Sequence, residues 1–235
     1  MLNTSRFAMF GGQELCQFRL ERWTRVNAAL ILLGSGLSLA LGTSYALGLL
    51  AALSFAWLLI AARGAYTPSG VFGHANTLTL LRTCVALSIA AVADLPGPRV
   101  ALFVLLVLAL DALDGAVARR RGQSSVFGAV FDVETDALMV MTVCIRLQQF
   151  EKLGAWVLVG GVLRYVYVLS FALAGRREPP GRSRLGRLAY GGLVLGLVLA
   201  LLSPGVWGSR AAMLGTLGVC LSFARSFRQL FAARA

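Results

Sequence analysis

Four aspartates stand inside otherwise apolar sequence, and they are the residues of this chain best suited to chemistry. Asp111 and Asp114 are three positions apart, and Asp132 and Asp136 are four apart. On an α-helix either spacing puts both carboxylates on one face. Carboxylates that converge in a low-dielectric site need a positive partner, and hard divalent cations such as Mg²⁺, Mn²⁺ or Ca²⁺ prefer oxygen ligands. The spacing therefore predicts a metal site, and four acids suit two ions better than one.

The elements that must position these acids are two helices joined by a polar turn. The flanks ALFVLLVLAL and ALMVMTVCI are apolar, while residues 119–124 are Arg, Gly, Gln and Ser. With that turn closing a helical hairpin, all four aspartates lie roughly 13–20 Å from it and can converge. Gly115 and Gly128 leave gaps where a ligand could approach the backbone, and Arg119 supplies a cation suited to phosphate. The alternative is a set of helix-pairing charges without a ligand, but intramembrane carboxylates point first to function.

These residues carry a resemblance to a known family, the CDP-alcohol phosphotransferases. The family signature is D-x2-D-G-x2-A-R-x8-G-x3-D-x3-D, and the sequence matches it at every fixed position. The matching residues are Asp111, Asp114, Gly115, Ala118, Arg119, Gly128, Asp132 and Asp136. The resemblance covers the chain from about residue 74 onward and implies an all-α, six-helix membrane core that carries an enzymatic site.

The resemblance also implies a role for each signature residue. Asp111, Asp114 and Asp132 would hold one Mg²⁺ or Mn²⁺ ion at a diphosphate, and Asp132 and Asp136 would share a second. Asp136 would take the proton from the attacking hydroxyl. The implied reaction transfers a phosphatidyl group from CDP-diacylglycerol to a small polar alcohol and releases CMP. The nucleotide or diphosphate would lie against Gly115, Ala118, Arg119, Ser125 and Gly128.

The composition is that of a polytopic membrane protein. Of 235 residues, 58% are hydrophobic and 14% are charged, which is too apolar for an ordinary soluble domain. The net charge of +12 comes from arginines in short polar segments, which the topology of a membrane protein explains better than nucleic-acid binding does. The four cysteines are scattered without metal-ligand spacing, so neither a disulfide framework nor a zinc site is expected. No sheet is expected.

The apolar runs divide the chain into a lead, a hairpin and a core. Residues 1–25 mix charged and aromatic side chains and predict a cytoplasmic or interfacial helix, with a disordered lead as the alternative. Residues 26–65 predict an accessory transmembrane hairpin with spans at 26–41 and 45–62, followed by a linker with turn residues. Residues 74–235 predict the catalytic core. About eight transmembrane helices result, the core spans being 77–93, 100–119, 125–150, 153–174, 185–202 and 206–231.

The arginines set the expected orientation in the membrane. With the amino terminus in the cytoplasm, the cytoplasmic side receives most of the arginines, Arg82 counted among them. The far side receives only Arg99, Lys152 and Arg210. This asymmetry predicts a multi-pass protein of the cytoplasmic membrane whose aspartate site opens toward the cytoplasm.

Two further polar groups could meet the nucleotide. Asn76, Thr79 and Arg82 recur at three-residue spacing where a span begins. They resemble an N-x-x-T-x-x-R stretch of the family, with Ala75 where a proline is common. Asn76 and Thr79 are therefore expected at the nucleotide or diphosphate, with a helix cap as the alternative for Asn76. Ser125 could equally cap the helix that follows it or touch the nucleotide.

Basic residues outside the signature are candidates for the acceptor site. Arg164 lies inside a span and needs a partner there, either Glu134 or a phosphate of the acceptor. Arg184 and Arg187 resemble a basic segment that family members place at the acceptor pocket, although membrane orientation alone would also explain them. A lysine common after the last aspartate in glycerol-3-phosphate-using members is Ala137 here. A glycerol-3-phosphate-like and an inositol-phosphate-like acceptor therefore both stay open.

Two rival functions use the same residues. An enzyme of this kind could instead transfer a CDP-linked headgroup onto diacylglycerol. A membrane cation carrier or a structural protein could use the aspartates without producing CMP, but it leaves Gly115, Ala118 and Arg119 unexplained at their spacing. The expected partners are CDP-diacylglycerol, a small polar alcohol and membrane lipid, with no nucleic acid, and a homodimer braced by the amino-terminal hairpin stays open.

Overall fold

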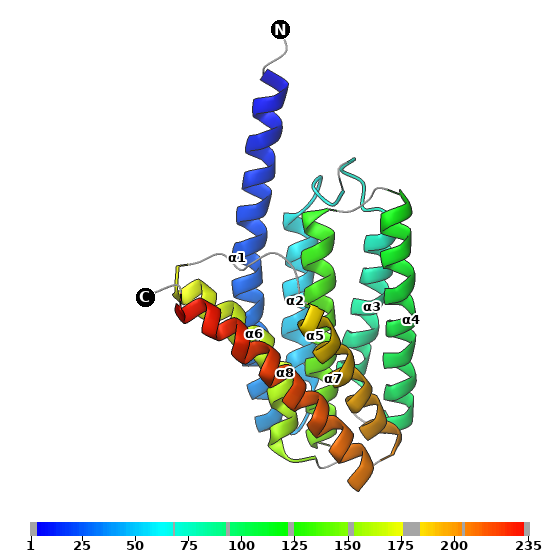
Figure 1. The fold of residues 1–235 in the computed structure, drawn as a ribbon. Helices are drawn as coiled ribbons and strands as arrows, with labels where there is room; N and C mark the ends of the chain where they lie inside the picture. The colour runs from blue at the N-terminus through cyan, green and yellow to red at the C-terminus, as the bar shows by residue number, and fades with distance from the viewer. Residues whose placement is uncertain are drawn as a thin grey trace.

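The chain folds into α-helices throughout its described part. The structure, a computed structural model, describes residues 4–232 except 68, 93–94, 122–124, 150–152, 176–183 and 204, and for 4–18, 112–121, 184 and 229–232 it describes the backbone alone. Within these residues there is no strand, so the predicted all-α class is confirmed. The elements are α1 (Thr4–Leu41), α2 (Tyr45–Ala61), α3 (His74–Ala91), α4 (Gly97–Arg121), α5 (Val126–Gln149), the 3₁₀ turn η1 (Ala155–Val157), α6 (Leu158–Leu173), α7 (Arg184–Leu202) and α8 (Val206–Ala232) (Figure 1).

The first helix differs from the expected arrangement. One continuous helix, α1, covers both the predicted lead and the first predicted span. No proline interrupts residues 4–41, so nothing in the sequence forces a break between the two segments. A helix of 38 residues is about 57 Å long, whereas the hydrocarbon core of a bilayer is about 30 Å thick. Its first turns therefore extend past the other helices, as Figure 1 shows, rather than forming a separate interfacial helix.

Four helical segments of the described chain are long and apolar enough to cross a membrane. They are Arg19–Leu41, Ala155–Leu173, Leu185–Leu202 and Val206–Arg228. The shorter α2 is also apolar, and large side chains on α1, α2 and α4, such as Leu33, Leu49 and Leu102, are more than half exposed. Apolar surface of this extent suits contact with lipid. The protein is therefore a polytopic membrane protein. That the other helices also cross the membrane, which would give eight spans in total, stays a prediction.

Helix α5 forms the centre of the bundle. It packs against α1, α3, α6 and α7, and every residue from Glu134 to Leu147 is buried. Three acids fall in its first half, which separates it from the uniformly apolar spans. These three acids therefore lie on a helix that is enclosed over much of its length.

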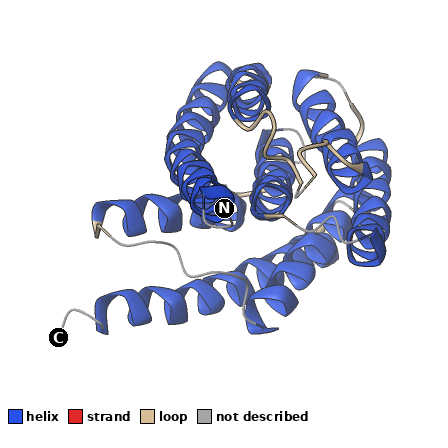
Figure 2. Cartoon of the chain, turned by 90° about the horizontal axis from the view of Figure 1, so that it is seen from above, coloured by secondary structure: helices blue, strands red, loops and turns tan. Residues whose placement is uncertain are grey.

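The last two helices pack closely because glycines line their contact. A Cβ atom on Gly196 would lie 2.4 Å from the backbone oxygen of Ala211, and one on Gly215 would lie 2.7 Å from Cα of Leu193. Only glycine permits such an approach between helix backbones. The tightly joined pair α7 and α8 crosses the other helices obliquely, which is visible in Figures 1 and 2.

Candidate active site

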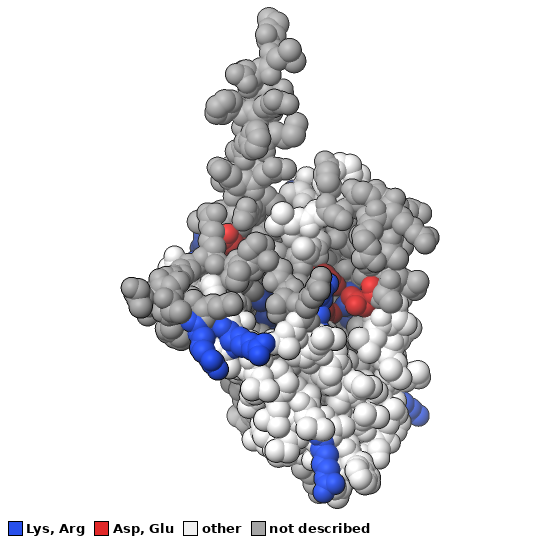
Figure 3. Space-filling model, in the orientation of Figure 1, with Lys and Arg blue, Asp and Glu red and all other residues white. Residues whose placement is uncertain are grey.

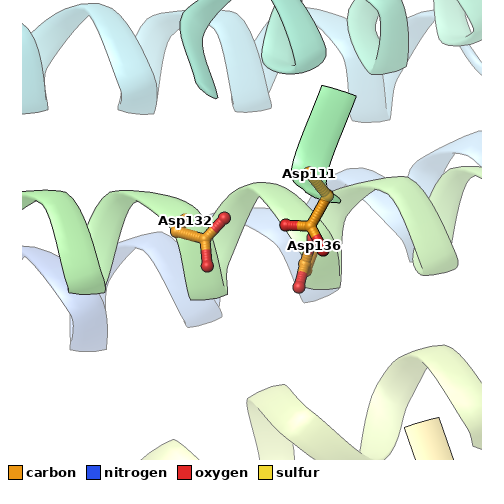
Figure 4. Close-up of side chains that lie close together, drawn as sticks. All are labelled: Asp111, Asp132 and Asp136. Atoms are coloured by element: carbon orange, nitrogen blue, oxygen red, sulfur yellow. The ribbon is translucent and has the colours of Figure 1, made fainter. Parts of the chain in front are cut away.

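Three aspartates from two helices meet at one point of the bundle. Asp132 and Asp136 are one turn apart on α5, and Asp111 comes from α4. One carboxylate oxygen from each residue lies within 4.8 Å of the other two, and Figure 4 shows the three side chains turned toward one another. The predicted convergence is therefore observed for these three residues.

Arg82 of α3 sits among the three carboxylates. Its Nη1 lies 2.9 Å from Oδ1 of Asp111 and 2.7 Å from Oδ1 of Asp132, and its Nη2 pairs with Asp136. The Arg82 side chain is 1% exposed, so it is not a loop charge that helps to set the membrane orientation, contrary to its place in the sequence-based count. The sequence showed Arg82 as part of a three-residue repeat, but its pairing with the acids depends on how α3 packs against α5.

The exposure of the aspartate side chains decreases from one side of the site to the other. The side chains of Asp111 and Asp132 are 45% and 38% exposed, whereas that of Asp136 is 9% exposed. Figure 3 shows acidic and basic atoms side by side on one face of the molecule, above a broad uncharged surface. A polar ligand can therefore reach Asp111 and Asp132 from outside, while Asp136 lies at the inner end.

The donor set fits a hard divalent cation. Two oxygens bound to the same Mg²⁺ lie at most about 4.2 Å apart, because each Mg–O distance is about 2.1 Å. The observed limit of 4.8 Å is within a small side-chain movement of that value. Such an ion would share the carboxylates with the Arg82 guanidinium or displace it from their Oδ1 atoms.

A second group of predicted residues joins α3, α5 and the linker before them. Asn76 donates from Nδ2 to the backbone oxygens of Phe72 (2.6 Å) and Tyr66 (3.2 Å). Ser125 donates from Oγ to the same Tyr66 oxygen (2.6 Å) and accepts from the Gly128 backbone N–H (3.0 Å). Ser125 therefore caps α5, which is one of its two predicted roles.

The structure corrects the helix-cap alternative for Asn76 and the open gap expected at Gly128. Asn76 is the third residue of α3, not its cap, because the helix begins at His74. A Cβ on Gly128 would lie 2.9 Å from Oδ1 of Asn76 and 3.2 Å from Oγ of Ser125, so those side chains fill the space beside the glycine. Thr79 is buried and donates from Oγ1 to the Ala75 backbone oxygen (3.2 Å). Contact of these residues with a nucleotide stays a prediction.

Several predicted residues lie outside the description of side chains. Helix α4 continues to Arg121, so its backbone covers the second half of the first aspartate pair. The side chains concerned are those of Asp114, Ala118, Arg119 and Arg184, and the surroundings of Gly115 are likewise not described. Their roles at the metal, the diphosphate and the acceptor stay predictions.

Arg164 lines a cavity between the last helices and α5. Its Nη2 is 2.6 Å from Oε1 of Glu134, so the first of its two predicted partners is confirmed. The cavity has a volume of about 140 Å³ and lies between α5, α6, α7 and α8, and Ala137, the residue after Asp136, forms part of its wall. Arg187 is exposed at the start of α7 and is not among the described residues that line this cavity.

Comparison with known proteins agrees with this site. The sequence profile described as CDP-alcohol phosphatidyltransferase matches residues 72–224. The chain is similar to a protein of Streptomyces coelicolor described as cardiolipin synthase (CMP-forming), with 35% identity over 128 residues. That similarity covers 51% of this chain and 60% of the relative, so the chain spans less than two thirds of the length of that relative. No solved structure matches the chain.

The profile includes all the aspartates of the site and Arg82, and it leaves out α1 and α2. It covers well over half of the sequence. This chain belongs to the CDP-alcohol phosphatidyltransferase family.

Proposed function

We propose that this protein is an integral membrane enzyme of phospholipid synthesis that transfers a phosphatidyl group from CDP-diacylglycerol to a polar alcohol. The observation that carries the proposal is the meeting of Asp111, Asp132 and Asp136 at one point of a family-typical core. Phosphoryl transfer needs positioning and charge neutralisation more than covalent chemistry by the protein. A group of carboxylates that opens to the outside at Asp111 and Asp132 and is enclosed at Asp136 is suited to that task.

The proposed reaction makes one bond and breaks one. The acceptor hydroxyl oxygen bonds to the phosphorus that carries the diacylglycerol, and the bond from that phosphorus to the bridging oxygen breaks, so CMP leaves. The hydroxyl proton goes to a carboxylate, for which Asp136 is the best placed because it lies at the inner end of the site, next to the cavity wall at Ala137. Asp136 is the proposed catalytic base.

The same carboxylates would hold the metal. Asp111, Asp132 and Asp136 supply the oxygen donors that Mg²⁺ and Mn²⁺ prefer, and Asp114 is the fourth proposed ligand. When bound, the metal supplies positive charge that offsets the negative charge of the diphosphate. Arg82 keeps the carboxylates close together by pairing with all three described ones.

The acceptor is proposed to be a phosphate-bearing alcohol that occupies the cavity beside Asp136. Arg164 offers a guanidinium to an anionic group there, with Tyr167, Ser222 and Ser226 as further polar lining. Glycerol 3-phosphate and phosphatidylglycerol share this chemistry, a free hydroxyl and a phosphate. The apolar part of the lining, which includes Val219 and Phe223, and the name of the Streptomyces relative favour the lipid.

The proposed location is the cytoplasmic membrane, with the aspartate site open to the cytoplasm. The positive-inside rule supports this orientation, since Arg99, Arg210 and the buried Arg146 are the described basic residues at the opposite ends of the spans. A single cysteine introduced at Arg210 should then be reachable by a membrane-impermeant thiol reagent from outside intact cells. If such a cysteine is labelled only after the cells are lysed, the protein has the opposite orientation in the membrane.

The proposal is tested by CMP release from CDP-diacylglycerol by the purified protein in detergent. The assay uses Mg²⁺ or Mn²⁺ and a panel of glycerol 3-phosphate, inositol phosphate, serine and phosphatidylglycerol, with Asp132→Asn as the control. We expect CMP with one phosphate-bearing acceptor and none from the control. If no acceptor yields CMP with either metal, the donor assignment is wrong, and CDP-linked headgroups with diacylglycerol are tried next.

A further inference from the structure

A line of buried polar side chains connects the amino-terminal hairpin to the cavity. Ser54 of α2 donates from Oγ to Oδ1 of Asn27 on α1 (2.7 Å). Asn27 donates from Nδ2 to Oε2 of Glu134 on α5 (3.0 Å). Arg164 of α6 donates from Nη2 to the other carboxylate oxygen of Glu134 (2.6 Å). Four helices are therefore joined side chain to side chain.

Because this line of side chains is buried, the loss of any one of its hydrogen bonds would leave a polar group without a partner in the protein interior. Asn27 and Glu134 are fully buried, and Ser54 is 1% exposed. A buried carboxylate is costly unless its oxygens accept hydrogen bonds, and here each oxygen of Glu134 has one donor. The Ser54 bond fixes which way the Asn27 amide points, because only its nitrogen can donate to Glu134. Glu134 is therefore held from the hairpin side and cannot turn without breaking the line.

Glu134 lies on the opposite face of α5 from the catalytic acids. It is two residues after Asp132 and two before Asp136, which is about 200° around the helix from each. Its partner Arg164 lies at the cavity wall, where the proposed acceptor would bind. The same stretch of α5 thus presents Asp132 and Asp136 on one face, and on the opposite face it holds the Arg164 guanidinium through Glu134.

We propose that Asn27 and Ser54 are positioning residues for acceptor binding. They fix Glu134, which holds the Arg164 guanidinium where it meets the anionic group of the acceptor. The inference rests on the proposed function, and it assigns a role to the hairpin, which lies outside the residues that the family profile matches. The hairpin completes the acceptor site from behind rather than touching the substrate.

The test measures acceptor and donor affinities separately in two variants. Ser54→Ala and Asn27→Ala should each raise the KM for the acceptor about tenfold and leave the KM for CDP-diacylglycerol unchanged. The acceptor is glycerol 3-phosphate or phosphatidylglycerol, whichever supports CMP release. Equilibrium binding of both compounds to the purified protein without CDP-diacylglycerol gives the same comparison independently of turnover. Ser54→Thr, which keeps the hydroxyl, should restore the wild-type acceptor KM.

Ser35→Ala is the matched control. Ser35 is also a buried serine of the hairpin, but its Oγ donates to the Ile31 oxygen of its own helix (2.7 Å). The change in atoms is the same as in Ser54→Ala, while the line to Glu134 stays intact. Neither KM should move in this variant.

A double variant separates positioning from general loosening of the bundle. If Asn27 acts through Arg164, then adding Asn27→Ala to Arg164→Gln should raise the acceptor KM no further. An additional rise, an equal rise of donor and acceptor KM in the single variants, or an unchanged acceptor KM would overturn the inference. A wild-type protein that binds the acceptor but releases no CMP refutes the proposed reaction alone, and the binding comparison still decides on Asn27 and Ser54. A wild-type protein that binds neither compound overturns the inference.

Discussion

Nη1 of Arg82 lies 2.7 Å from Oδ1 of Asp132, so a cation of the protein stands where the carboxylates meet. The same guanidinium also reaches Asp111 and Asp136. Without this guanidinium, three acids within 4.8 Å of one another would repel. Arg82 thus serves the folded protein as a counter-charge to the three acids.

The first prediction concerns the dependence of stability on metal. Arg82→Met should lower the thermal unfolding midpoint in EDTA, because breaking a buried ion pair costs about 3–5 kcal/mol. Added Mg²⁺ should then stabilise the variant more than the wild type, since the acids would bind the cation without a competing guanidinium. The measurement is the shift in unfolding midpoint between EDTA and Mg²⁺ for both proteins.

Arg146→Met is the control for that experiment. Arg146 is as deeply buried as Arg82, but it lies away from the aspartate site, where it donates to the backbone oxygens of Val92 (3.0 Å) and Leu95 (2.7 Å). Its loss should destabilise the protein equally with and without Mg²⁺. If Arg82→Met behaves in the same way, Arg82 has no special relation to the cation.

The part of the site that sequence alone predicts is the part that one helical hairpin determines. The spacing of Asp132 and Asp136 fixes them on one face of α5. Asp111 joins them as predicted, although α4 packs mainly against α3 and α7 rather than against α5. The contacts of Arg82 and Asn27 with acids of α5 could not be predicted from the sequence. They reach α5 from helices whose rotation about their own axes depends on the packing of the whole bundle. The pairing of Arg164 with Glu134 was predictable only as one of two options, since a charge inside a membrane span requires a partner but the sequence does not identify which residue or ligand it is.

Helix boundaries show the same division. The eight helices follow from apolar runs and turn residues, and they were expected in this order. The continuity of α1 was not expected from the sequence. A polar lead and an apolar span can share one helix when no proline or turn separates them. The packing reason for Gly128 also depends on a distant residue, Asn76, that no local pattern connects to it.

The second prediction tests the proposed base. Asp136→Asn keeps the shape of the side chain but removes its capacity to take a proton, so CMP release should fall by about 10²–10⁴-fold. The variant should elute as a single peak in size-exclusion chromatography at the wild-type volume. Activity within a few-fold of the wild type in a well-folded Asp136→Asn protein would exclude Asp136 as the base.

The third prediction concerns removal of the metal. Dialysis of the purified protein against EDTA should abolish CMP release, and Mg²⁺ or Mn²⁺ should restore it, because the diphosphate charge is otherwise unbalanced at the aspartates. Equilibrium dialysis of Mn²⁺ against wild type and Asp132→Asn provides a reading without turnover. Equal Mn²⁺ binding by both proteins would place the ion somewhere other than this site.

The fourth prediction uses the close contact at Gly128. Gly128→Ala places a methyl group 2.9 Å from Oδ1 of Asn76, so either the Asn76 side chain must shift from its bonds to Phe72 and Tyr66 or the start of α5 must move. Overpacking of this kind costs about 1–3 kcal/mol and should lower the unfolding midpoint. The control is Gly36→Ala in α1, where a Cβ meets nothing within 4 Å. That change should leave the midpoint unchanged or raise it, since alanine favours a helix over glycine by about 1 kcal/mol.

The fifth prediction assigns the cavity to the acceptor rather than to the donor. Ala189 of α7 lines the cavity together with Arg164 and Tyr190, so Ala189→Phe should fill much of its volume. The KM for the acceptor should rise at least tenfold while the KM for CDP-diacylglycerol stays the same, because the aspartates are reached from the open side at Asp111. Leu202→Phe, an exposed position at the end of the same helix, should change neither value. A rise in the donor KM alone would show that the cavity holds part of CDP-diacylglycerol, and the acceptor would then have to enter by the open side of the aspartate site.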